Sequence, residues 1–124
     1  MTNIQILIVE DDHDYLFMLA EMFRKRFKVQ VQMASSVDAA ESLLETTDFD
    51  MVISDIQMPG RNGIEVLRIL LRLNKSVPLI FFTASDISQR DLDQHGYPCV
   101  VVNKKDHRDL LQIASEFLSK PLKG

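Results

Sequence analysis

Four acidic residues stand directly after short apolar segments of the chain. Glu10, Asp11 and Asp12 follow the apolar residues 4–9, and Asp55 follows a second apolar run. Carboxylates at the ends of neighbouring strands repel one another, and they persist together when a hard cation holds them. Because these candidate ligands are oxygen atoms and include no imidazole or thiolate, they favour Mg²⁺ over Zn²⁺. The pattern therefore indicates a magnesium site between the two segments.

A hydroxyl group and an ammonium group occupy two further positions of the same kind. Thr83 follows the apolar residues 77–82, and Lys104 and Lys105 come after residues 99–102. A lysine supplies a point charge for an anion, and a threonine hydroxyl can donate a hydrogen bond. With the acids and a metal ion, these groups suit the transfer of a phosphoryl group to a carboxylate. In that reaction the metal neutralises charge and the lysine holds phosphate oxygens.

Each of these residues also has an ordinary explanation. A single carboxylate after a strand is most often a helix N-cap, and Asp12 or His13 could cap the helix that follows. Lys104 or Lys105 alone would most often be a solvated surface lysine. The combination at four strand ends is what favours chemistry over these ordinary roles.

The elements that must position these residues alternate between strands and helices. Five apolar segments predict strands, at residues 4–9, 29–33, 51–54, 77–82 and 99–102. Five amphipathic segments predict helices, at residues 13–27, 85–94 and 106–118 and around Ala40 and Leu67. Such alternation predicts an α/β fold, in which helices cover both faces of a parallel sheet. Ligands of these folds bind beyond the carboxyl ends of the strands, where the candidate residues fall.

Length and composition exclude several classes of protein. The 124 residues fit one domain, residues 1–124, with residues 119–124 as a tail or the start of a linker. A net charge of −4 without a dense basic patch argues against direct nucleic-acid binding. No apolar run approaches the roughly 18 residues of a membrane span, and no signal peptide is recognisable. Since Cys99 is the only cysteine, we expect a buried free thiol and a cytoplasmic protein.

The order of these motifs resembles the receiver domains of bacterial two-component response regulators over nearly the whole chain. The most specific segment is residues 55–63, DIQMPGRNG, which resembles the family's D-x-x-M-P-x-x-x-G motif. Residues 8–12 (IVEDD) and 81–84 (FFTA) resemble the family's acidic pair and its switch-hydroxyl strand. The resemblance implies a doubly wound (βα)5 fold with the flavodoxin-like strand order 2-1-3-4-5.

The resemblance also implies a role for each matched acid. Asp55 corresponds to the family's phosphoacceptor. Asp11 corresponds to a direct Mg²⁺ ligand, together with Asp55 and the backbone carbonyl of Gln57. Glu10 corresponds to the first acid of the pair at the same metal site.

Near the fifth strand the sequence departs from the family pattern. Thr83 is implied as the switch hydroxyl and Lys104 as the phosphate-contacting lysine, with Lys105 as an alternative one residue away. Lys105 stands where the family usually has a proline with an often cis peptide bond, and Val101 stands at the switch-aromatic position. We therefore expect altered signalling through the fourth helix and fifth strand. We expect Tyr97 to be a loop aromatic rather than a substitute for the switch aromatic.

The implied function is a signalling switch rather than an enzyme. A sensor histidine kinase or histidine phosphotransfer protein would donate the phosphoryl group, and a downstream protein or a separate output domain would respond. A phosphorylation-independent binding module is an alternative, kept open by Val101 and Lys105. An FMN-binding flavodoxin needs a neutral phosphate loop where residues 10–12 are acidic. An aspartate-nucleophile phosphatase needs an acid where Gln57 stands.

Overall fold

The computed structural model describes residues 4–119 and forms one five-stranded parallel sheet. The strand order is β2-β1-β3-β4-β5, which confirms the predicted order 2-1-3-4-5. The strands are β1 (Gln5–Val9), β2 (Gln30–Ala34), β3 (Met51–Ser54), β4 (Leu79–Thr83) and β5 (Cys99–Asn103). The helices are α1 (His13–Phe27), α2 (Val37–Thr46), α3 (Ile64–Arg72), α4 (Gln89–Asp93) and α5 (His107–Ser119).

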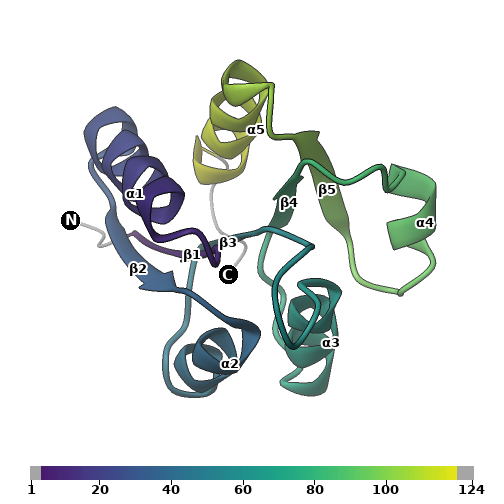
Figure 1. The fold of residues 1–124 in the computed structure, drawn as a ribbon. Coiled ribbons are helices and arrows are strands. Elements are labelled where there is room, and N and C mark those ends of the chain that lie inside the picture. The colour runs from purple at the N-terminus through teal and green to yellow at the C-terminus, as the bar shows by residue number, and fades with distance from the viewer. Residues whose placement is uncertain (1–3, 120–124) are drawn as a thin grey trace.

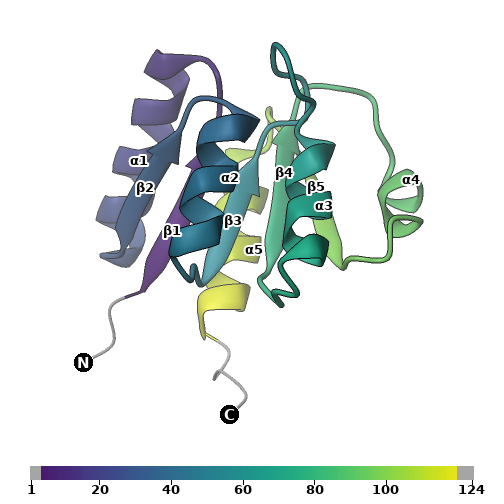
Figure 2. The ribbon, with the colours of Figure 1, turned by 90° about the horizontal axis from the view of Figure 1, so that it is seen from below.

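Helices cover both faces of the sheet, as the alternation of elements predicts. Figure 1 shows α1 and α5 on one face and α2 and α3 on the other, with α4 beyond β5 at the edge. In Figure 2 the sheet is seen with α2 and α3 in front of it. The chain passes from β1 to β2 on one side and returns to β3 on the other. The topological switch point, where such folds bind ligands, therefore lies between β1 and β3.

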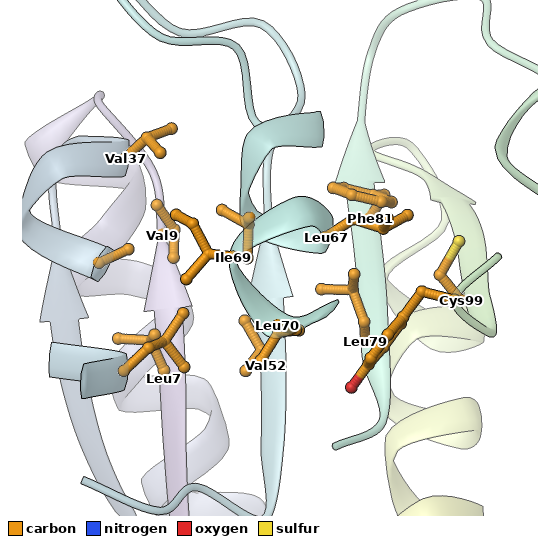
Figure 3. Close-up of a cluster of buried hydrophobic side chains, with 14 of the residues drawn as sticks. Leu7, Val9, Val37, Val52, Leu67, Ile69, Leu70, Leu79, Phe81 and Cys99 are labelled. Carbon is orange, nitrogen blue, oxygen red and sulfur yellow. The ribbon is translucent and has the colours of Figure 1, made fainter. Parts of the chain in front are cut away.

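The sheet separates two apolar clusters because successive side chains of a strand point to opposite faces. Figure 3 shows the cluster under α2 and α3, in which Val52 of β3 lies near Leu70 of α3 and Phe81 of β4 lies near Leu67 of the same helix. Ile53 and Phe82 belong to the cluster on the opposite face. Every residue of β3 and β4 is buried, which explains why these strands are almost continuously apolar in sequence.

Two helices begin at side-chain caps, and the sequence suggests the first of them, Asp12. Asp12 caps α1, and its carboxylate accepts a hydrogen bond from the Tyr15 amide at 3.1 Å. Ser36 caps α2, and its hydroxyl accepts from the Ala39 amide at 3.1 Å. Of the three consecutive acids after β1, Asp12 thus has a structural role.

The predicted helix over residues 85–94 was wrong at its start, since α4 begins at Gln89. Ser88 and Asp91 form a reciprocal capping box that fixes this beginning. The residues before it form a turn, in which the Ser85 amide donates to the Thr83 hydroxyl at 3.2 Å. The local hydrogen bonds of these polar side chains compete with helix formation.

A glutamine side chain connects α4 to the edge of the sheet. The Gln89 amide nitrogen donates to the Cys99 carbonyl at 2.6 Å, and the Val101 amide donates to the Gln89 amide oxygen at 3.0 Å. The side chain therefore pairs with β5 as a neighbouring strand would. Within residues 4–119, no helix has the length and apolar character needed to cross a bilayer.

Candidate functional site

The register of the sheet brings the acids of two loops together. Val9 of β1 pairs with Ser54 of β3, so that Glu10 and Asp55 follow adjacent strand ends. The Asp55 amide donates to the Val9 carbonyl at 3.0 Å, which extends the pairing by one residue. The carboxyl groups of Glu10 and Asp55 consequently meet at the topological switch point.

Lys104 joins these acids from the far side of β4. Its backbone amide donates to the Thr83 carbonyl at 3.0 Å, which holds the residue at the end of β5. Its ammonium nitrogen lies 2.8 Å from the Asp55 carboxylate and 2.9 Å from the Glu10 carboxylate. One lysine thus bridges two acids that lie on different loops.

The acids form a cluster that fits a hard divalent cation. One carboxylate oxygen each of Glu10, Asp11 and Asp55 lies within 4.8 Å of the others, and Asp11 is the exposed member. These oxygen ligands, without sulfur or imidazole, suit Mg²⁺. Gln57 is exposed two residues after Asp55. The ligand role of its carbonyl stays a prediction.

Burial and charge oppose one another in this cluster. Burial raises the pKa of Glu10, while the hydrogen bonds from Lys104 and from the Asp12 amide act in the opposite direction. Burial by itself would lower the pKa of Lys104, but its bonds to Asp55 and Glu10 outweigh burial and raise it. The lysine therefore stays charged.

The loop after β3 fixes the Asp55 side chain against the backbone. One carboxylate oxygen accepts from the Ile56 amide at 2.7 Å, and the Ser54 hydroxyl donates to the Asp55 carbonyl at 2.7 Å. Gly63 approaches this loop from α3, and its amide donates to the Ile56 carbonyl at 2.7 Å. The other carboxylate oxygen of Asp55 faces Lys104.

Thr83 lies at the same edge of the sheet but bonds to a different partner. Its buried hydroxyl is 2.9 Å from the Ser85 hydroxyl and also accepts the Ser85 amide. The structure thus brings Glu10, Asp11, Asp55 and Lys104 into one cluster and places Thr83 on the neighbouring strand end. The role of Thr83 as a phosphate partner stays a prediction.

The structure separates the two candidate lysines. Lys105 is exposed, and its amide donates to the Asn103 side chain at 2.8 Å, whereas Lys104 reaches Asp55. The peptide bonds of residues 4–119 include no cis bond. Val101 is partly buried in β5 and pairs with Phe81 of β4, so a valine and not an aromatic ring stands at the predicted switch-aromatic position.

Tyr97 does not replace the absent aromatic. It precedes β5 and so lies at the opposite end of the strands from Thr83. Its buried hydroxyl accepts from the Val77 amide at 2.6 Å and donates to the Val77 carbonyl at 2.5 Å. The prediction of a loop aromatic is confirmed, and the ring also joins the core under α3.

An aromatic ring that no sequence motif singled out lies beside the lysine. The Lys104 ammonium nitrogen lies over the Tyr15 ring, 4.7 Å from its centroid. The ring stacks on Phe82, and its hydroxyl lies 3.1 Å from Nε2 of His107. The signal in the sequence that could have pointed to Tyr15 is its position near the start of the helix, three residues after the cap Asp12.

Known proteins share the sequence pattern. The response regulator receiver domain family matches residues 6–96. The chain is 38% identical over 84 residues to the two-component response regulator ARR14 of Arabidopsis thaliana, covering 66% of this chain and 22% of that relative. It is 31% identical over 84 residues to sporulation initiation phosphotransferase F of Bacillus subtilis, covering 68% of this chain and 67% of the relative. The match to ARR14 thus spans about a fifth of that protein.

Solved structures share the fold. The non-phosphorylated HemR receiver domain of Leptospira biflexa has a TM-score of 0.84 at 26% identity, covering 98% of this chain and 99% of that one. The response regulator TrrA of Thermotoga maritima, in complex with Mg²⁺-BeF, has a TM-score of 0.81 at 24% identity, covering 92% and 98%. With the family match and the site geometry, these likenesses lead to one conclusion: the chain belongs to the receiver domains of two-component response regulators.

Proposed function

We propose that this receiver is a phosphorylation switch. Asp55 accepts a phosphoryl group from phosphohistidine of a sensor histidine kinase or histidine phosphotransfer protein, in a Mg²⁺-dependent reaction in the cytoplasm. The observation that carries the proposal is the bridge from Lys104 to Asp55 and Glu10, at 2.8 and 2.9 Å. A lysine held between two acids at the strand ends supplies a positive charge for an incoming anion.

The acidic cluster supports the metal requirement. Glu10, Asp11 and Asp55 would hold Mg²⁺, with the Gln57 carbonyl as a further oxygen ligand. An ion bound by these residues would neutralise negative charge on the phosphoryl group that is transferred. The complex of the related-fold protein TrrA with Mg²⁺-BeF is consistent with this assignment.

The residues of the chain account for the transfer itself. A carboxylate oxygen of Asp55 attacks phosphorus as the bond to the histidine nitrogen breaks, and the imidazole leaves with the electron pair. The bond from the Ile56 amide holds the other carboxylate oxygen in place. Lys104 then moves its hydrogen bond from Asp55 to a phosphate oxygen, and the Thr83 hydroxyl turns from Ser85 to another.

The response spreads from Thr83 to the face formed by α4 and β5. Because Val101 has no ring that could rotate, we infer that the response travels through the turn after Thr83 and the Gln89 bonds to β5. The target is a downstream protein or an output domain outside this chain. The protein changes its interactions and does not turn over a substrate.

A binding module that acts without phosphorylation is the second candidate function. The observation that favours it is Val101, which breaks the usual path from hydroxyl to aromatic. The two candidates differ in one measurable property, which is covalent modification of Asp55.

Intact mass spectrometry after incubation with acetyl phosphate and Mg²⁺ tests the proposal. We expect one added phosphoryl group that hydroxylamine removes, as an acyl phosphate requires, and that EDTA prevents. Asp55→Asn should abolish the adduct. Asp48→Asn, a change at an exposed acid outside the site, should leave it unchanged. Absence of the adduct with both acetyl phosphate and a phosphohistidine donor would refute the proposal and favour the binding module.

A further inference from the structure

Lys104 has three partners, and one of them is uncharged. Two are the carboxylates of Asp55 and Glu10, and the third is the ring of Tyr15, 4.7 Å from the ammonium nitrogen. A cation over the face of a tyrosine ring is attracted by the negative charge density of that face. Both acids belong to the cluster that fits Mg²⁺, whereas the ring cannot bind a metal ion in this way. The ring is therefore the partner whose interaction is independent of the metal and the phosphoryl group.

Neighbouring groups on three elements fix the Tyr15 ring. Its backbone amide bonds to the Asp12 cap at the start of α1. One side of the ring stacks on Phe82 of β4, with centroids 6.4 Å apart and planes 18° apart. Its hydroxyl lies 3.1 Å from Nε2 of His107, the first residue of α5. A ring held in this way presents its face at a fixed place in the site.

We propose that Tyr15 is a positioning residue for Lys104, holding the ammonium group in the site while its carboxylate partners change during phosphorylation of Asp55. The inference rests on the proposed function, although the contact between ring and lysine is independent of it. During transfer, the acids also bind the metal ion and the phosphoryl group. Without the ring, the lysine would lose its remaining partner at this step. Transfer then slows because fewer lysine conformations reach a phosphate oxygen.

The first test measures the contact in the unphosphorylated protein. Protons above an aromatic ring are shielded, so the ε-methylene protons of Lys104 should resonate upfield of those of the other lysines. Lys104→Arg identifies the signal. The upfield shift should persist in Tyr15→Phe, which keeps the ring, and disappear in Tyr15→Leu. If Tyr15→Leu does not fold, Tyr15→Met takes its place.

The second test measures the initial rate of adduct formation with acetyl phosphate at saturating Mg²⁺. For a partly buried cation on a ring, we expect Tyr15→Leu to be about five-fold slower than wild type. Tyr15→Phe should restore most of the rate. Phe17→Leu is the matched control because Phe17 lies on the same helix and is 59% exposed, and its rate should equal that of wild type.

The outcomes separate this inference from the proposed function. A wild-type spectrum without the upfield shift overturns the positioning role, and so does a Tyr15→Leu rate equal to that of wild type. A Tyr15→Phe protein as slow as Tyr15→Leu also overturns it, because the hydroxyl and not the ring would then be responsible. If wild type forms no adduct, the proposed function fails, and the shift alone supports or overturns the placement of the lysine.

Discussion

Gly63→Ala measures how closely α3 packs against the loop that carries Asp55. A methyl group at this position would lie 1.9 Å from the Asp55 carbonyl oxygen and 2.8 Å from the Ile56 Cα. The oxygen contact is about 1.5 Å shorter than ordinary van der Waals contact. Because both neighbours are backbone atoms, no side-chain rotation can relieve the overlap. Gly63 has a φ of −60°, so the backbone conformation itself does not require glycine.

The magnitude follows from two effects that act in the same direction. Overpacking costs typically about 1–3 kcal/mol and occasionally more, and contact with backbone belongs at the upper end. Gly63 is the N-cap of α3, where alanine is less favourable than glycine, so this effect adds to the cost of overpacking. We therefore expect Gly63→Ala to lower the free energy of unfolding by about 2–3 kcal/mol. Urea denaturation monitored by circular dichroism would show a lower midpoint with an unchanged slope. Phosphorylation of Asp55 should fall as well.

Gly60 provides the control within the same loop. A Cβ at Gly60 would meet no atom within 4 Å, but the residue has a φ of +79°. Gly60→Ala should therefore cost about 1 kcal/mol through backbone conformation alone, and Gly60→Asn should cost less because asparagine tolerates that region. A Gly63→Ala protein as stable as wild type, or more stable than Gly60→Ala, would refute the close-packing argument.

Three further changes test the charges and the buried phenol. In the absence of Mg²⁺, Lys104→Met should lower the free energy of unfolding by about 1–3 kcal/mol, because the buried Glu10 carboxylate loses the lysine ammonium group. An unchanged urea midpoint would contradict this prediction. Mg²⁺ at ten times its Kd should stabilise the wild-type protein by about 1.4 kcal/mol, which is measured as a higher Tm. Asp11→Asn should lose most of this stabilisation. An equal rise in Tm for both proteins would exclude Asp11 as a ligand. Burial raises the pKa of Tyr97 above that of the unfolded chain. The contribution of Tyr97 to stability is thus complete below about pH 10 and is lost as pH rises through the pKa of the folded state. The free energy of unfolding of Tyr97→Phe should therefore fall less steeply at alkaline pH than that of wild type. Parallel curves for the two proteins would contradict this prediction.

The sequence predicts the sheet and the acidic site for the same physical reason. Strands buried on both faces are read as apolar runs, and parallel strands bring their ends to one edge. Glu10, Asp55 and Lys104 all come within one residue of a strand end, so the fold alone brings them near one another. Counting residues along the chain does not decide between the two lysines, and the structure does: Lys104 reaches the acids, whereas Lys105 is exposed.

Contacts between elements distant in sequence could not be predicted in this way. The start of α4 depends on a capping box and on a turn at Thr83, whose side-chain hydrogen bonds override a helical pattern. The contact between Lys104 and Tyr15 joins the residue just after β5 to a residue on α1, and no local spacing relates the two. The pairing of Gln89 with β5 likewise depends on where α4 packs. Such details follow from tertiary packing and not from periodicity.

The Gln89 side chain has a consequence for how the molecule avoids other copies of itself. β5 is an outer strand, and the free N–H and C=O groups of an outer strand are a template on which strands of another chain can add. Gln89 occupies one group of each kind on that edge, while Leu92 anchors the short α4 in the core. The element that we expect to move in signalling is thus also the cover that prevents sheet-to-sheet aggregation. Any rearrangement of α4 must keep the edge covered, or place a partner there.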